Sequence, residues 1–240
     1  QMKEENRKKI KRGISYQDLL SICIGKAFAN QESFRSYLGD YRRWDTDVTQ
    51  GVLVVDERVF EVEYIGTTSK GDSLWYTAEQ EQVIPDAGIR MMLKIKKFLK
   101  EKDIPEFYFP RAQLSPNLSE HDLAMIFCTL AEEQVCYFNG SGEVSIFMFV
   151  KNLPEDIFKP VPAQRFFQIA MHIVQHYRVN AKKMIESFLI ENETEYLAEE
   201  NTITAFFEND TEIEFQFKED KLVKVKGNLN AEEDEETLDI

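Results

Sequence analysis

Cysteine is scarce in this chain of 240 residues, which contains only Cys23, Cys128 and Cys136. The odd number and the lack of a Cys-x-x-Cys spacing argue against a disulfide framework and against a zinc ribbon. Cys23 and Cys128 lie among apolar residues of predicted helices, where a thiol behaves as a small buried hydrophobic group. This use of cysteine predicts a cytoplasmic location.

Long apolar runs and an excess of basic residues are also lacking. No apolar segment approaches the roughly 20 residues that a membrane helix needs, and the charged stretch 1–12 predicts no secretory signal. The formal net charge is −14. Such a charge opposes binding to nucleic acid phosphates and to anionic lipid, so we expect neither as a partner.

The sequence lacks the known catalytic and phosphate-binding motifs. Asn139-Gly-Ser-Gly lies between two predicted strands, so Ser141 is typical of a hairpin turn and not of a nucleophile elbow. There is no Walker sequence, and Gly66-Thr-Thr-Ser-Lys-Gly is typical of a hairpin loop, with phosphate binding as the alternative. We therefore predict no catalytic residue and no cofactor, and we lean toward a protein that is not an enzyme.

His172 and His176 are the candidates for metal binding. Their i, i+4 spacing places two imidazoles on one face of a helix, but the glutamate of the zinc proteases is missing between them. A third ligand would have to come from His121 or from a distant carboxylate. A solvated helix face is the favoured interpretation, and a metal site is the alternative.

Acidic residues flank the first predicted sheet, and Glu61 and Glu63 alternate along one strand. Two carboxylates on the same face of a strand ordinarily indicate a solvated surface. General acid–base chemistry would need one of them desolvated in a cleft.

Apolar and aromatic residues are plentiful, since 43% of the chain is hydrophobic and 18 residues are Phe. Their spacing predicts about five helices and a larger number of strands. The predicted helices are 16–38, 86–101, 119–130, 166–177 and 180–189. The predicted strands are 44–48, 51–55, 58–65, 73–78, 135–138 and 143–150, then a meander over 195–226. Residues 104–109, bounded by Pro105 and Pro110, can form an edge strand at most.

This order of elements is not a βαβα alternation, so it predicts an α+β fold. We expect antiparallel sheets built from meanders and hairpins and packed by about five helices. The charged segments 1–13 and 229–240 are predicted to be tails. A single α+β domain should span 14–228, with 153–162 as a candidate boundary between sub-domains.

Aromatic side chains gather on the predicted strands. Trp44, Trp75, Tyr76 and Tyr137 fall on what we expect to be one sheet. Core packing is the common role of strand aromatics. If Trp75 or Tyr76 faces away from the helices, it can line a ligand-binding groove, so we take these four residues as ligand-binding candidates.

The chain resembles an uncharacterised bacterial domain family of unknown function, from about residue 14 to residue 227. The matching pieces are Trp44 with Asp47, Gly66-Thr with Ser73-Leu-Trp75, Ile104-Pro-Glu, Leu123-Ala-Met, Tyr137 and Leu153-Pro. Members of the family have a Trp-rich strand where this chain has Leu74-Trp-Tyr-Thr-Ala78. The resemblance implies membership and no particular activity.

Three functions are compatible with this sequence. The first is a non-enzymatic binding or protein-interaction module, with a protein or a small ligand as its partner. The second is an enzyme or small-molecule receptor with an acidic cleft near the Trp75 strand. The third is an immunity-type inhibitor whose acidic surface covers a basic partner. A pocket that holds Trp75 with a desolvated carboxylate would favour the second.

Overall fold

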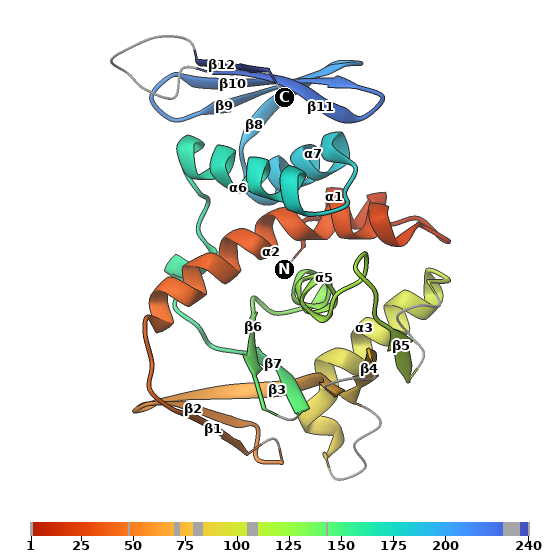
Figure 1. Ribbon diagram of the computed structural model, residues 1–240, viewed down its shortest axis with the longest axis vertical. Coiled ribbons are helices and arrows are strands. Elements are labelled where there is room, and N and C mark those ends of the chain that lie inside the picture. Colours follow the sequence, from red (N-terminus) through yellow and green to blue (C-terminus); the bar gives the residue numbers. More distant parts are fainter. Residues whose placement is uncertain are drawn as a thin grey trace. The chain divides into compact units, whose positions relative to one another are not determined.

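The computed structural model describes residues 2–47, 49–69, 73–78, 84–104, 110–142 and 144–227, together with the backbone of 236–239. These residues form both helices and antiparallel sheets, so the predicted α+β class is confirmed (Figure 1). Each strand pair recorded within the described residues is antiparallel. Most of the predicted edge segment 104–109 lies outside the described residues.

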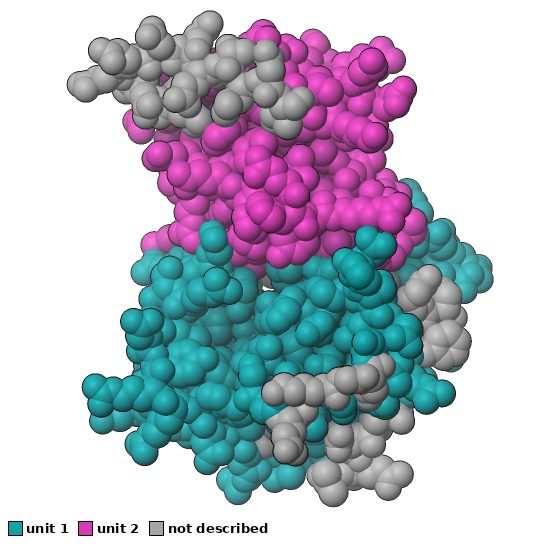
Figure 2. All heavy atoms as spheres, in the orientation of Figure 1, with its two compact units in different colours: residues 1–2, 11–14, 30–158 teal, residues 3–10, 15–29, 159–240 magenta. Residues whose placement is uncertain are grey.

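The chain divides into two compact units, which Figure 2 colours separately. Unit 1 consists of residues 1–2, 11–14 and 30–158, and unit 2 of residues 3–10, 15–29 and 159–240. Helix α2 (Tyr16–Leu38) contributes its residues up to 29 to unit 2 and the others to unit 1. The chain passes from unit 1 back to unit 2 after residue 158.

Unit 1 is built on a seven-stranded sheet in which β1 to β5 follow in order and β7 pairs with both β3 and β6. The strands are β1 (Trp44–Asp47), β2 (Val52–Val55), β3 (Arg58–Ser69), β4 (Leu74–Thr77), β5 (Arg111–Gln113), β6 (Cys136–Gly140) and β7 (Val144–Val150). The predicted hairpins are present as β2–β3 and β6–β7. β2 and β4 pair with successive parts of β3, residues 58–61 and 66–68.

Strand β3 is longer than its sequence predicts. We expected a turn to begin at Gly66, but the strand continues to Ser69. Thr67 pairs with Tyr76 of β4 and with Ile146 of β7, so partners on both sides extend the strand. Threonine suits such a position because its branched side chain packs well on a pleated surface.

Among its described residues, unit 1 also contains the end of α2, α3 (Arg90–Glu101), α5 (Glu120–Leu130) and the 3₁₀ turns η2 (Asp86–Ile89) and η3 (Glu155–Phe158). The predicted start of α5 is confirmed. Ser119 Oγ accepts a hydrogen bond from the Asp122 amide at 3.1 Å, and Asp122 Oδ2 accepts one from the Ser119 amide at 3.0 Å. This reciprocal capping box satisfies two amides at the helix start.

Unit 2 contains a five-stranded sheet in the order β12-β11-β10-β9-β8. Its elements are α1 (Glu4–Lys9), the start of α2, α6 (Ala163–His176), α7 (Ala181–Glu191), β8 (Glu195–Ala198), β9 (Thr202–Phe207), β10 (Thr211–Lys218), β11 (Lys221–Gly227) and β12 (Glu236–Asp239). Phe166 of α6 stacks on Phe188 of α7 with ring centroids 4.2 Å apart, and lies 6.3 Å from Phe215 of β10. The two helices therefore pack on one face of this sheet (Figure 1).

Polar residues form the turns between the strands β9, β10 and β11 of unit 2. Asn209 and Asp210 have φ values of 58° and 55°, and Glu219 and Asp220 have φ values of 50° and 61°. Paired positive φ values are the geometry that a two-residue hairpin turn favours, because its twist matches that of the strands. The turn predicted at Asn209-Asp210 is confirmed, and the next one lies one residue earlier than predicted.

Residues 4–9, which we expected to lie in a charged tail, form helix α1. Asn6 and Ile10 are fully buried. Asn6 Nδ2 donates to the Ser187 carbonyl and to Glu191 Oε1 of α7, each at 2.9 Å. Residues four apart share a helix face, so this basic segment has one uncharged side. At the other end, 229–235 lie outside the described residues, while 236–239 form β12.

Candidate functional site

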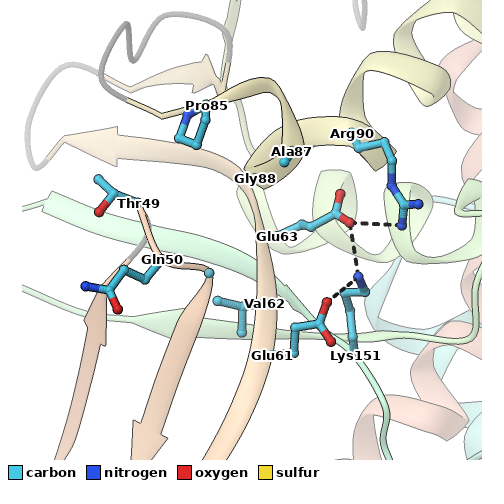
Figure 3. Close-up of a pocket in the computed structure, with 11 residues that line it drawn as sticks. Thr49, Gln50, Glu61, Val62, Glu63, Pro85, Ala87, Gly88, Arg90 and Lys151 are labelled. Carbon is cyan, nitrogen blue, oxygen red and sulfur yellow. Dashed lines mark hydrogen bonds and ion pairs between the residues drawn. The ribbon is translucent and has the colours of Figure 1, made fainter.

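A pocket with a volume of about 400 Å³ lies in unit 1, beside the middle of β3 (Figure 3). One wall comes from the turn before β2, residues 49–51, and from η2 with Pro85 before it. Glu61, Glu63, Arg90 and Lys151 supply its charged side chains. Figure 3 shows these four close together, with Thr49, Gln50 and Pro85 at the opposite end.

Glu63 is the most deeply buried carboxylate of this group, with 4% of its side chain exposed. Its Oε2 accepts the backbone amide of Met91 at 2.7 Å. That amide is one of the unpaired donors in the first turn of α3, where the helix dipole also favours a negative charge. Its Oε1 lies 3.3 Å from both Arg90 Nη2 and Lys151 Nζ. A carboxylate can be buried here because each of its oxygens has a donor.

Lys151 directly follows β7, and 10% of its side chain is exposed. Its ammonium group lies 2.7 Å from Glu61 Oε1, 3.3 Å from Glu63 Oε1 and 3.8 Å from Glu133 Oε2. Burial alone would lower the pKa of Lys151, but the hydrogen bonds to Glu61 and Glu63 outweigh it and the pKa is raised. Lys151 therefore carries a positive charge at neutral pH.

Arg90 is the first residue of α3, and half of its side chain is exposed. Its Nη2 lies 2.6 Å from Glu133 Oε1, outside the pocket lining, and 3.3 Å from Glu63 Oε1. The charges of Glu63 and then Glu133 raise the pKa of Arg90 further. Arg90 thus joins the pocket to the loop after α5.

Glu61 is more exposed than Glu63, with 54% of its side chain accessible. Besides Lys151, it accepts a hydrogen bond from Asn152 Nδ2 at 2.8 Å. The hydrogen bond from Lys151 is the main reason that the pKa of Glu61 is lowered. Glu61 is therefore ionised throughout the neutral range.

The pKa of Glu61 gives a testable pH dependence. We expect wild type to be more stable than Glu61→Gln above the ordinary glutamate pKa of 4.5. The difference should shrink as the pH falls through the lower pKa of folded Glu61, because a depressed pKa stabilises only while the group is ionised. Urea unfolding of both proteins between about pH 7 and pH 3 measures this difference in the free energy of unfolding. Glu195→Gln, on an exposed position of β8, controls for the loss of one negative charge. A stability difference that does not depend on pH would contradict the lowered pKa of Glu61.

The predicted ligand-binding aromatics are not in the lining of this pocket. Trp75 is 1% exposed, and its ring lies 6.2 Å from Phe127 of α5 and 5.3 Å from Phe147 of β7. Tyr137 is also buried, and its ring lies 6.0 Å from Phe147. The structure therefore brings Trp75 and Tyr137 together around Phe147. Their role in ligand binding stays a prediction.

Trp44 and Tyr76 lie elsewhere on the sheet. Trp44 is half-buried and meets Phe138 edge-on with ring centroids 5.7 Å apart. Tyr76 is half-buried on β4 and pairs with Thr67 and Arg111. Both belong to the seven-stranded sheet, as predicted, and their role in ligand binding also stays a prediction.

His172 and His176 are exposed on α6, as their helical position predicted. Their rings stack with centroids 4.4 Å apart, and His176 Nδ1 lies 2.9 Å from the His172 carbonyl. Within the described part of the chain, no three His, Cys, Asp or Glu side chains are grouped to hold a metal ion. Burial raises the pKa of Cys23, Cys128 and Cys136. These thiols are therefore protonated and unreactive.

The sequence did not predict the difference between Glu61 and Glu63. Both alternate on β3, but only Glu63 lies at the start of α3, with Arg90 and Lys151 around it. A signal was present in the sequence, since Lys151 is a single charge immediately after the apolar strand β7. Such a lysine ordinarily needs a buried carboxylate beside it.

Comparison with known proteins identifies the family. Residues 17–153 match a family of unknown function, DUF6882. Because the match covers more than half of the 240 residues, the chain belongs to this family. The matched span begins in α2 and ends just after β7, so it includes every charged residue of the pocket but less than the 14–227 that we expected. No curated protein and no solved structure matches the chain.

A helix that crosses a bilayer needs about 20 mostly apolar residues, and no helix in the described part of the chain meets this requirement.

Proposed function

We propose that unit 1 is a binding module for a small polar molecule, held in the pocket beside Glu63. The observation that carries this proposal is a buried carboxylate at 4% exposure in the wall of a pocket of about 400 Å³. Ligand pockets commonly have volumes of about 300–1,000 Å³ and contain a few well-placed polar groups. The pocket is therefore large enough for a small molecule.

The charges of the pocket support binding in preference to proton transfer. Lys151 and Arg90 have raised pKa values and Glu61 has a lowered one. Groups whose pKa lies far from neutral keep their charge, whereas a general acid or base works best with a pKa near the working pH. Three of the four charged lining groups are thus suited to electrostatic recognition.

The composition of the chain bears on where this module is located and on what it binds. The net charge of −14 and the three free cysteines support a cytoplasmic protein that binds neither nucleic acid nor membranes. A binding module of this kind needs no cofactor.

Thermal unfolding in the presence of small polar compounds tests the proposed function. The compounds are amino acids, sugars, short carboxylates, polyamines and nucleosides. A ligand at about 100 times its Kd should raise the unfolding temperature by about 5 to 10 °C, since it binds only the folded state.

Two matched variants locate the binding. Ala87→Phe places a large ring at an exposed position of the pocket wall, while Ala198→Phe makes the same change on β8 of unit 2. The shift should disappear in the first and persist in the second. Equal shifts in all three proteins, or no compound that stabilises wild type, would refute the proposal.

A further inference from the structure

We propose that the pocket binds a zwitterion with one carboxylate and one ammonium group, of the α-amino acid class. This inference rests on the proposed function and names its ligand. Its basis is the distribution of charge in the lining, where the buried charges satisfy one another while two half-exposed charges of opposite sign face the pocket.

The buried pair is Glu63 and Lys151. Each oxygen of Glu63 already has a donor, and Lys151 contacts two carboxylates within 3.3 Å. A ligand that competed for either group would remove one of the contacts that compensate the burial of the other, which is costly. These two residues therefore belong to the rigid wall of the pocket and are not the groups that a ligand engages.

Arg90 and Glu61 are the groups that remain accessible, with 50% and 54% of their side chains exposed. Among the described residues, both ion pairs of Arg90 use Nη2. Since a guanidinium group has five N–H donors in a fixed plane, the N–H donors of Nη1 remain for a ligand carboxylate. Glu61 accepts one hydrogen bond on each oxygen, and each oxygen has a further lone pair for a ligand ammonium group.

A ligand with only one charge fits this lining poorly. The two carboxylates and two cations of the described lining sum to zero, so the pocket attracts no net charge. A lone anion on Arg90 would meet repulsion from Glu61, and a lone cation on Glu61 would meet repulsion from Lys151. A zwitterion can place its carboxylate on Arg90 and its ammonium group on Glu61. It carries no net charge, so a pocket without net charge does not disfavour it.

The rest of the pocket suits a small uncharged side chain. Figure 3 shows Thr49, Gln50 and Pro85 at the end away from the ion pairs. Ala87 and Gly88 of η2 continue this wall. A volume of about 400 Å³ is near the lower limit of ligand pockets, which favours a free amino acid over a folded partner.

Calorimetric titration of the full chain tests the inference. The probes are L-alanine, L-leucine and L-glutamine, each with the amine that lacks its carboxylate and the acid that lacks its ammonium group. At least one amino acid should bind about tenfold or more tightly than both of its analogues, because each charge-assisted hydrogen bond contributes about that factor.

Two variants test which residue holds each charge of the ligand. Arg90→Gln should remove the preference for the amino acid over its amine, and Glu61→Gln should remove the preference over its acid. Both positions are half-exposed, and unfolding temperatures check that the variants fold. If Arg90→Gln does not fold, Arg90→Lys retains the charge without the planar fork and should weaken binding of the amino acid and the acid alike.

The outcomes separate this inference from the proposed function. If sugars, nucleosides or single-charge compounds bind as tightly as any amino acid, the zwitterion is wrong and the small-molecule pocket stands. If no compound of either set binds, both proposals fail. If the amino acids bind but both glutamine variants retain the full preference, the assignment to Arg90 and Glu61 is wrong.

Discussion

Replacement of Lys151 by methionine is expected to lower the free energy of unfolding by about 3–5 kcal/mol. Methionine retains the length and apolar stem of lysine but not its charge, so Glu63 would remain buried with Arg90 as its one cation among the described residues. Arg90 is half-exposed and also pairs with Glu133, which makes it an incomplete substitute. Urea unfolding at neutral pH measures the loss.

Two further variants decide whether the buried charge is the cause. Lys94→Met breaks an exposed ion pair with Glu132 and should change stability by no more than about 1 kcal/mol. The double variant Lys151→Met/Glu63→Gln removes both buried charges and should recover about 1 kcal/mol or more of the loss, as expected for coupled neighbours. A Lys151→Met variant no less stable than Lys94→Met would contradict this account.

Gly66→Ala is expected to cost about 3 kcal/mol, at the upper end for an overpacked core. A methyl group at Gly66 would lie 2.4 Å from the Tyr76 carbonyl oxygen and 2.5 Å from Cζ2 of Trp75. Neither neighbour can move easily, because Tyr76 is paired in β4 and Trp75 is surrounded by core side chains. Chemical denaturation measures this loss.

Two other glycines provide the comparison. At Gly142 a methyl group would lie 3.4 Å from its nearest neighbour, so Gly142→Ala should change stability by no more than about 1 kcal/mol. At Gly140 it would lie 2.3 Å from Cη2 of Trp44, but that ring is half-buried and can shift. Gly140→Ala should therefore cost less than Gly66→Ala. Equal stability of all three variants would show that Trp75 is loosely packed.

These contacts join two of the sequence pieces on which the predicted family resemblance was based. Gly66-Thr and Ser73-Leu-Trp75 are separate in the sequence, but Gly66 lies directly against Trp75 across the β3–β4 pair. A large ring on one strand needs a residue without a side chain on the next. The two pieces are therefore one packing unit, and their joint presence marks the fold in preference to a site.

The sequence predicted the features that depend on neighbouring residues. The two hairpins of unit 1, the capping box at Ser119 and the meander of unit 2 follow from alternation and turn chemistry within about ten residues. The extension of β3 beyond Gly66 and the packing of α1 on α7 were not predicted. Both depend on partners that are distant in the chain: β7 pairs with the end of β3, and Ser187 accepts from Asn6.

The candidate site was less predictable for the same reason. Glu61 and Glu63 were recognised as a pair with a solvated surface as the favoured interpretation, and the acidic cleft was expected near the Trp75 strand. The burial of Glu63 depends on Lys151, which is 88 positions away, and on Met91, which is 28 positions away. Alternation along one strand cannot distinguish two carboxylates whose surroundings come from other elements.

Segments of unit 2 both precede and follow the main part of unit 1, residues 30–158, and this order affects how the protein forms on the ribosome. Residues 15–29 are made early, whereas the larger part of unit 2 follows residue 158. At about 5–20 residues per second, they wait on the order of ten seconds. During that time Phe28 lacks His172 and Tyr177, the rings that it contacts when folded. Released chains truncated near residue 158 should therefore expose this helix to chaperones, even when the seven-stranded sheet is complete.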